Sequence, residues 1–581
     1  MDSFAALKRR TTDLLQNIPH SLPSIKPQSH DNGVVKATWE RINVPPLPRS
    51  SHSIDIVAGT AYIFGGETKP REPVDNDMHC ITLPFSSADA DYYPIKAKAD
   101  KQPPAEPPKQ QPAIPEVVDE KPEEKDLDDV PLASPSPAAP AETTASEPEP
   151  ALSKGKEPAE AAEPNYSSLG DVPAPRVGHA TAVIGHRIFM FGGRGGPDMQ
   201  PLEEFGRVWV FDTRTHTWTY LDPLPPATAA PAGSPSAVTK PRYPAARSYH
   251  SAVATDKPRH PELKPVRRTE SWKEWAQGDS DVVGTPQRPI VGNIAAGATD
   301  EDSDGYGTFI VHGGCFVQGR ASDVWAFDVR SRVWQELPNA PGKPRGGTAI
   351  AIAKSRLYRF GGFNGEGEEG GQLDYLELVI DSFNDASGRG EVCIGARGGW
   401  KSLLREEDAS ATEGEKSDDA AAAVPLTGPP PEWPGNRSVA GLEAVTAGGG
   451  REYLVLLLGE RDPSNAGHAA AGKFWDDVWA FQVPLHGHDH TAASVSDKVR
   501  GVFGAGGRSG EGRWFRVEAE AYDDEDDEEA GRGPGPRGWI ATAAMGELEE
   551  RGVVVWGGLD SENKRLGDGW ILRLGSEKRE P

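Results

Sequence analysis

Apolar and polar residues alternate over residues 176 to 218 in a pattern that predicts four short β-strands. Each apolar run is short, and glycine or aspartate residues typical of turns separate the runs. The second run ends at Gly192-Gly193, where the absence of a Cβ atom allows a tight turn beside a neighbouring backbone. The predicted strands cover Ala180 to Val183, Arg187 to Phe191, Val208 to Phe211 and the residues around Trp218. This segment is therefore predicted to form one four-stranded antiparallel unit.

The same unit recurs along the chain, and this internal repetition predicts the fold class. Glycine doublets end an apolar run at Gly65-Gly66, Gly192-Gly193, Gly313-Gly314, Gly361-Gly362 and Gly557-Gly558, and Leu458-Gly459 is a degenerate copy. An arginine precedes each copy, at Arg49, Arg176, Arg247, Arg345, Arg437 and Arg537. One such unit cannot bury its apolar face alone, whereas several arranged radially can. The sequence predicts an all-β, six-bladed β-propeller with blades that start near residues 49, 176, 247, 345, 437 and 537.

Aromatic residues indicate how the ring closes. A fourth-strand anchor can be assigned to each blade: Tyr166, Trp218, Trp334, Trp400, Trp514 and, for the last blade, Trp39. Few residues follow Ile571, so the sixth blade lacks a fourth strand of its own, whereas Trp39 to Ile42 precede the first blade. We expect this N-terminal strand to complete the last blade, because closure removes sheet edges that otherwise promote aggregation.

Long polar insertions interrupt the repeats. They are rich in Pro, Ala, Glu and Lys and poor in aromatic and β-branched residues, so they cannot bury enough apolar surface to offset chain entropy. The predicted organisation is an N-terminal extension over residues 1–35 and a propeller over residues 36–575. Disordered insertions are expected near residues 97–164, 223–246, 256–304, 406–434, 484–512 and 519–533.

Charge and cysteine content exclude several classes of function. The formal net charge is −26 and no part of the predicted ring is strongly basic, which disfavours nucleic-acid binding. No run approaches the roughly 20 apolar residues of a membrane span, so no membrane association is expected. The only cysteines, Cys80, Cys315 and Cys393, fall in different blades without metal-ligand spacing. A reducing setting, cytosolic or nuclear, fits this cysteine usage best, and a cytoplasmic location is expected.

The repeats resemble the kelch family of propellers, and several loops resemble the plant nitrile-specifier and thiocyanate-forming proteins. The kelch likeness lies in the glycine doublets and the Val-Trp-x-Phe third strands. The narrower likeness is carried by Gly65-Gly66-Glu67 with Pro73, Asp75 and Asp77; Phe191 to Arg194; Gly362 to Gly365; Gly459-Glu460 through His468; and Arg537-Gly538-Trp539. It spans the predicted ring and none of the insertions.

The specifier likeness implies a ferrous iron site in a top-face pocket and lyase activity on an unstable sulfur compound. The family's ligands are a Glu, an Asp and a His spaced four residues apart each time. Glu460 and His468 keep the outer spacing, but Ser464 holds the middle position, so the implied site needs a shifted loop that brings Asp462 to the metal. Carboxylate and imidazole ligands suit ferrous iron.

The same likeness implies roles for two further residues in catalysis. Arg194 matches an arginine that holds the substrate's sulfate, and Trp539 matches a pocket tryptophan that lies against an apolar substrate group. Arg320 and Asn364 are further candidate ligand-binding residues, because they follow the doublets of two other blades and are expected near the same axis.

Two functions remain open. The favoured hypothesis is a protein-interaction scaffold that presents its top face and acidic loops to a protein partner. The alternative is a ferrous-iron-dependent, specifier-like lyase acting on a small sulfur-containing anion, with Glu460, Asp462 and His468 as ligands. A propeller fold does not by itself decide between them, because function resides in the site.

Overall fold

The computed structural model describes the strands of the repeats and their short connections. The described residues are 34–84, 89–100, 165–225, 242–257, 307–383, 391–405, 433–447, 450–464, 470–484, 512–522, 533–546 and 548–575. Their only helix is the 3-10 turn Tyr166–Ser168, and all other elements are strands. Within these residues no helix has the length and apolarity needed to cross a membrane. The expected insertions lie largely outside the described residues.

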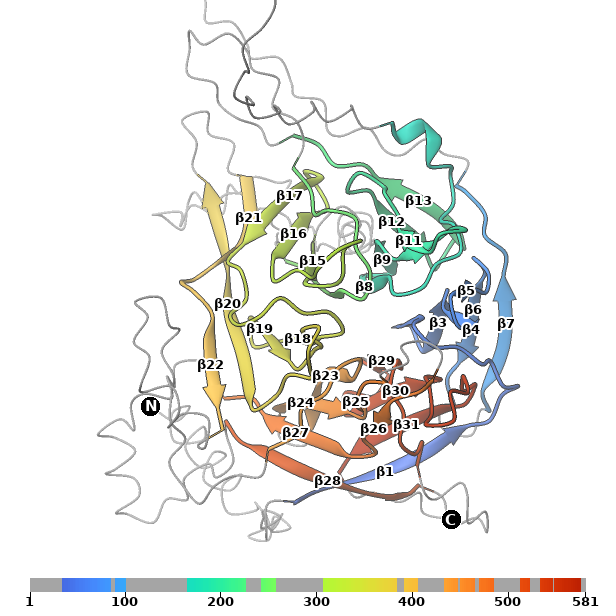
Figure 1. Ribbon diagram of the computed structural model, residues 1–581, viewed down its shortest axis with the longest axis vertical. Coiled ribbons are helices and arrows are strands. Elements are labelled where there is room, and N and C mark those ends of the chain that lie inside the picture. The colour runs from blue at the N-terminus through green and yellow to red at the C-terminus, as the bar shows by residue number, and fades with distance from the viewer. Residues whose placement is uncertain are drawn as a thin grey trace, which may run out of the picture. The chain divides into compact units, whose positions relative to one another are not determined.

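Six antiparallel four-stranded blades are arranged around a common axis (Figure 1). Blades one to three consist of β2 (Ser53–Val57), β3 (Thr60–Phe64), β6 (Met78–Thr82) and β7 (Asp91–Ile95); β8 (Ala180–Ile184), β9 (Arg187–Phe191), β12 (Val208–Asp212) and β13 (Thr217–Leu221); and β14 (Ser251–Thr255), β15 (Thr308–His312), β16 (Val324–Asp328) and β17 (Val333–Leu337). Blades four to six consist of β18 (Ala349–Ala353), β19 (Arg356–Phe360), β20 (Gln372–Phe383) and β22 (Lys401–Leu404); β23 (Gly441–Ala447), β24 (Arg451–Leu457), β27 (Val478–Gln482) and β28 (Trp514–Ala521); and β29 (Ala541–Ala544), β30 (Gly552–Trp556), β31 (Gly569–Leu574) and β1 (Val34–Ile42).

Smaller strands decorate these blades. In blade four, β21 (Glu391–Ala396) pairs with the second half of β20. Short hairpins are formed by β4 (Glu67–Lys69) with β5 (Glu72–Pro73), by β10 (Arg194–Gly195) with β11 (Gln200–Pro201), and by β25 (Glu460–Asp462) with β26 (Lys473–Phe474). Each hairpin begins directly after a doublet, so it lies on the face where the candidate site residues were expected.

The N-terminal strand closes the ring, as the sequence predicts. β1 pairs antiparallel with β31 and places Trp39 opposite Leu572. Its other edge pairs in parallel with β28 of blade five, so β1 joins the fifth and sixth blades into one sheet (Figure 1). Both edges of β1 are hydrogen-bonded, which leaves neither β28 nor β31 open along the paired segment.

The core lies between neighbouring blades. Trp218 of blade two packs on Phe64 of blade one, with ring centroids 5.1 Å apart. Trp334 of blade three packs in the same way on Phe191 of blade two, at 5.3 Å. The fourth-strand aromatic residue therefore fills the space over the second strand of the preceding blade. Such large side chains supply much of the apolar burial that holds adjacent blades together.

The arginine that precedes each blade is a structural residue. Arg176 is fully buried, donates from Nη1 to the carbonyl oxygen of Gly192 at 3.0 Å and forms an ion pair with Glu204 at 2.8 Å. The equivalent arginines pair with carboxylates of their own blades, namely Asp75, Asp323, Glu369, Asp477 and Asp568. Buried guanidinium groups with these fixed partners hold the doublets in place and are not available to a ligand.

The second residue of each doublet connects its blade to the next. Gly193 donates its backbone N–H to the carbonyl oxygen of Arg247 at 2.9 Å, and the same bond occurs at every blade junction. A Cβ atom added to Gly192 would lie 2.7 Å from that oxygen, so glycine at this position lets the two blades approach closely. In the degenerate copy Leu458 takes the first position with φ 56°.

Three sequence predictions about element placement are wrong. Tyr166 lies in the 3-10 turn, and the fourth strand of blade one is β7. Residues expected at the start of the first insertion continue the fold, because Trp218 donates its backbone N–H to the carbonyl oxygen of Lys98. The insertion expected from residue 519 also starts later, because β28 extends to Ala521. In the last two cases a neighbouring blade supplies backbone partners that the composition of the segment does not reveal.

Candidate functional site

A closed circle of six backbone hydrogen bonds lies at the propeller axis. One residue of each blade takes part, two positions after the buried arginine. Each of these residues donates its N–H to the carbonyl oxygen of the equivalent residue in the preceding blade, at 2.7 to 3.1 Å. The six members, called here the axial ring, are Ser51, Gly178, Tyr249, Gly347, Val439 and Trp539. All have positive φ, between 45° and 63°.

A cavity of about 590 Å³ opens above the axial ring. Five of the six ring members line it, and its walls come from the loops that follow the doublets. Residues on these walls include Glu67, Arg194, Cys315, Phe316, Arg320, Phe363, Ser438, Glu460 and Arg565. A cavity of this size, with aromatic walls and a few polar groups, has the character of a small-molecule site.

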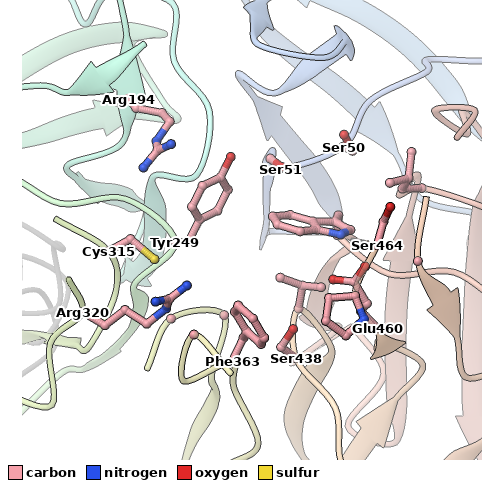
Figure 2. Close-up of a pocket in the computed structure, with 18 of the residues that line it drawn as sticks. Ser50, Ser51, Arg194, Tyr249, Cys315, Arg320, Phe363, Ser438, Glu460 and Ser464 are labelled. Carbon is pink, nitrogen blue, oxygen red and sulfur yellow. The ribbon is translucent and has the colours of Figure 1, made fainter. Parts of the chain in front are cut away.

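Two wall arginines differ from the structural arginines in their partners. Arg194 donates from Nε to Oγ of Ser248 at 2.9 Å and lies over the ring of Tyr249. Arg320 lies over the ring of Phe363, and its Nε is buried without a hydrogen-bond partner in the described part of the chain. Neither guanidinium forms an ion pair with a described carboxylate. Figure 2 shows both groups directed at the open space, with Cys315 between them.

The remaining charged groups of the cavity are paired or neutralised. Glu67 and Arg565 form a buried ion pair, with Nη2 and Oε1 2.7 Å apart. Burial raises the pKa of Glu460 from its ordinary 4.5 to about 7, although a hydrogen bond with Trp539 acts in the opposite direction. At mildly acidic to neutral pH this carboxyl therefore holds its proton to a large extent.

Glu368 contacts the cavity residue Ser438, and its pKa is raised further than that of Glu460. Burial raises its pKa to about 8; a hydrogen bond from Ser438 opposes the shift, and the carboxyl group of Glu460 adds to it. The Ser438 hydroxyl donates to Oε1 of Glu368 at 3.1 Å, and Oε2 is buried without a partner among the described residues. With both carboxyls protonated, Arg194 and Arg320 dominate the charge of the cavity.

Cys315 brings a thiol into the cavity between the two arginines (Figure 2). Burial raises its pKa above the ordinary 9.0, while the charges of Arg320 and Arg194 act in the opposite direction. Because the thiolate is the nucleophilic form, a raised pKa keeps Cys315 in its unreactive thiol form near neutral pH.

The structure brings together several residues that the sequence singled out. Arg194, Arg320, Trp539 and Glu460 all line the cavity. Asn364 is not among the lining residues: its side chain donates to Glu369 and accepts from the backbone of Glu366 and Gly367. Its proposed ligand contact stays a prediction.

The described residues do not complete the implied iron site. Asp462 lies outside the cavity wall, its carboxylate 55% exposed and within 3.5 Å of the Lys473 ammonium group. His468 lies outside the described residues. No group of three His, Cys, Asp or Glu side chains that could hold a metal ion occurs in the described ranges. Of the three implied ligands, only Glu460 is placed at the cavity, so the iron site stays a prediction.

The sequence analysis missed several residues of the site, among them Tyr249, Cys315 and Glu368. Tyr249 could have been found, because it follows Arg247 at the same interval as Trp539 follows Arg537. Cys315 directly follows a doublet, which gives a weaker signal of the same kind. Glu368 carries no such signal, since only the packing of blade four on blade five brings it to Ser438.

Comparisons with known proteins agree with the repeat architecture. Residues 175–225 match the family described as Kelch motif. An N-(sulfonatooxy)prop-2-enimidothioate sulfolyase of Thlaspi arvense is 44% identical over 50 residues, which are 9% of this chain and 14% of that protein. A flagellar outer arm dynein alpha chain of Chlamydomonas reinhardtii is 24% identical over 219 residues, or 37% of this chain and 3% of that protein. The chain thus matches only a small part of each of these curated relatives.

One solved structure, described as "Structure of YjhT", is similar over 92% of this chain and 99% of its own, with 10% identity and a TM-score of 0.41. Fold and repeats together define the class: the protein is a six-bladed β-propeller of the kelch type, with a kelch motif in its second blade. A more particular likeness, to a plant sulfolyase, is confined to a short segment.

Proposed function

We propose that the axial cavity binds a small organic anion. The proposal rests on one observation: Arg194 and Arg320 face the cavity, and neither has an ion-pair partner among the described residues (Figure 2). A guanidinium group offers forked donors that suit a sulfate, phosphate or carboxylate group. Aromatic and apolar wall residues leave room for an uncharged remainder of the ligand.

Charge and similarity support this choice. The chain as a whole is strongly acidic, so a cavity with two arginines that lack an ion-pair partner among the described residues contrasts with its general charge. The raised pKa values of Glu460 and Glu368 reduce their negative charge near neutral pH. The name of the sulfolyase relative describes a substrate with a sulfonatooxy group, which is an organic anion of this class.

Isothermal titration calorimetry with phenyl sulfate at pH 6.5 tests the proposal. We expect saturable binding with one site per chain, and no binding of phenol, which lacks the anionic group. Arg194→Ala and Arg320→Ala should each weaken binding about tenfold or more, because a charge-assisted hydrogen bond contributes about 1.5–3 kcal/mol.

Arg242→Ala is the matched control, because Arg242 is exposed, pairs with Glu336 and is absent from the cavity wall. It removes the same charge and should leave the affinity unchanged. Equal affinities of the wild type, Arg194→Ala and Arg320→Ala would contradict the proposal.

A second candidate is docking of a protein partner on the rim of the same cavity. Val317 lines the cavity and is 69% exposed, the highest exposure of any large hydrophobic side chain in the described ranges. Phe316 and Phe363 line the same cavity, and a contiguous apolar surface rimmed by polar groups is a feature of interaction sites. Quantitative co-purification from the native host should recover a stoichiometric partner with the wild type and less with Val317→Ser. Recovery that is the same for both baits would exclude Val317 from such an interface.

A further inference from the structure

The axial ring holds its non-glycine residues in an unfavourable backbone conformation. Positive φ values suit glycine, and blades two and four place Gly178 and Gly347 at this position. The other blades place Ser51, Tyr249, Val439 and Trp539 there, with φ between 45° and 58°. All four of these side chains line the cavity. Backbone strain of this kind persists where the surrounding structure enforces it, and it concentrates at functional sites.

Val439 shows the conflict most clearly. Its φ is 45°, and a β-branched residue with positive φ is a genuine outlier. The axial ring enforces this conformation, since Val439 donates to Gly347 at 2.8 Å and accepts from Trp539 at 3.1 Å. Glycine at this position would keep both bonds without the strain. The isopropyl group therefore brings backbone strain, and it gives the cavity an apolar surface.

The ring side chains form a continuous floor beneath the cavity. Tyr249 and Trp539 meet edge to face across the axis, with ring centroids 5.2 Å apart. A hydrogen bond joins the Tyr249 side chain to Ser51. The Val439 side chain lies against the Cα of Gly347, where an added Cβ would be 2.9 Å from its Cγ1. The Tyr249 ring lies against Gly178, where an added Cβ would be 2.7 Å from it, so Tyr249 and Val439 flank the two glycine members of the ring and form part of the cavity floor.

We infer that Val439, supported by the Tyr249–Trp539 pair, is a specificity-determining residue that limits the apolar part of the ligand to a compact group. This inference rests on the proposed function, because it assumes that Arg194 and Arg320 hold the anionic end. Val439 belongs to blade five, across the axis from Arg194 of blade two, so it is placed to meet the uncharged end of the ligand. The ligand class is accordingly an anionic ester or acid with a short apolar substituent.

Affinities for methyl, butyl and hexyl sulfate test this inference in the wild type, Val439→Ala and Val439→Gly. We expect the wild type to favour butyl over hexyl sulfate. Val439→Gly deepens the cavity, so the ratio of hexyl to butyl affinity should rise at least tenfold, with Val439→Ala between the two. Thermal unfolding of the same proteins should show Val439→Gly to be more stable than Val439→Ala, because only glycine relieves the strain.

Ala58→Gly is the control for relief of strain alone, because Ala58 has φ 48° in an exposed turn and is not a cavity residue. It should leave all three affinities unchanged. Wild-type binding with the same ratio in all variants overturns the inference and leaves the proposed function standing. Val439→Gly less stable than Val439→Ala also overturns it. Absence of wild-type binding to every sulfate overturns both the proposed function and the inference.

Discussion

Gly558 of the last blade donates its backbone N–H to the carbonyl oxygen of Arg49 in the first blade, at 2.8 Å. The bond is the same as the one that joins each other pair of neighbouring blades, so the ring closes without a special junction. Because the chain returns to its start through a standard contact, the six blades can place their loops around one axis. That arrangement brings Arg194 of blade two and Arg320 of blade three to the same cavity.

The close contact at the doublets predicts a large cost for a single methyl group. Gly65 has φ 62°, and a Cβ at this position would lie 2.6 Å from the carbonyl oxygen of Arg176. Gly65→Ala should lower the free energy of unfolding by about 2–4 kcal/mol, the sum of backbone strain and overpacking. Gly185→Ala is the matched control, since Gly185 has the same φ with no atom within 4 Å of the added Cβ, and should cost about 1 kcal/mol. Equal losses in urea denaturation would show that the blade contact is not tight.

Closure by β1 predicts that the ring depends on the N-terminal strand. Deletion of residues 1–45 removes β1 and exposes the backbone edges of β28 and β31. We expect this variant to aggregate, as unpaired edge strands do. Deletion of residues 1–33 keeps β1 and should give a soluble protein with the wild-type circular dichroism spectrum. A soluble, folded variant that lacks residues 1–45 would contradict the role of β1.

The raised pKa values of Glu460 and Glu368 predict that anion binding weakens as the pH rises. Burial raises the pKa of Glu460 to about 7, so this group is neutral at pH 5.5 and negative at pH 8.5. Ionisation places a negative charge on the cavity wall and opposes a bound anion, so the affinity for phenyl sulfate should fall several-fold between these pH values. Glu460→Gln keeps a neutral side chain of similar shape and should flatten this dependence. An equally steep dependence in Glu460→Gln would assign the effect to another group, with Glu368 the next to replace.

Metal content decides whether the lyase implied by the specifier likeness can operate. Protein purified anaerobically without a histidine tag and supplied with ferrous iron should, on that hypothesis, hold about one iron per chain. Glu460→Ala and His468→Ala should each lose it, because carboxylate and imidazole are the implied ligands. Asp462→Ala tests whether Asp462 is an iron ligand. If this variant loses iron, the Asp462 carboxylate must leave Lys473 to reach the metal; if the variant keeps its iron, Asp462 is not a ligand. If the wild-type protein binds no iron under these conditions, the hypothesis of a metal-dependent lyase is rejected.

Much of the fold follows from local chemistry that is visible in the sequence. The doublets, the preceding arginines and the fourth-strand aromatic residues each occupy the structural role that their repetition indicates. The prediction that Tyr166 lies on a fourth strand failed, because the spacing of the repeat does not fix the position of an aromatic residue that follows a long insertion. The predicted insertion boundaries also failed at Lys98 and Ala521, where a neighbouring blade provides pairing that the segment's own composition does not encode.

The candidate site, too, was predictable from the sequence only in part. The sequence by itself determined that Arg194, Arg320, Glu460 and Trp539 belong to loops of one face, since each follows a repeated marker, either a glycine doublet or the arginine that starts a blade. Only the tertiary structure decided which arginines are available, because Arg176 and Arg194 differ in whether the blade folds a carboxylate against them. The raised pKa of Glu460 and the backbone strain at Val439 were likewise decided by the tertiary structure, since both depend on groups brought together from separate blades.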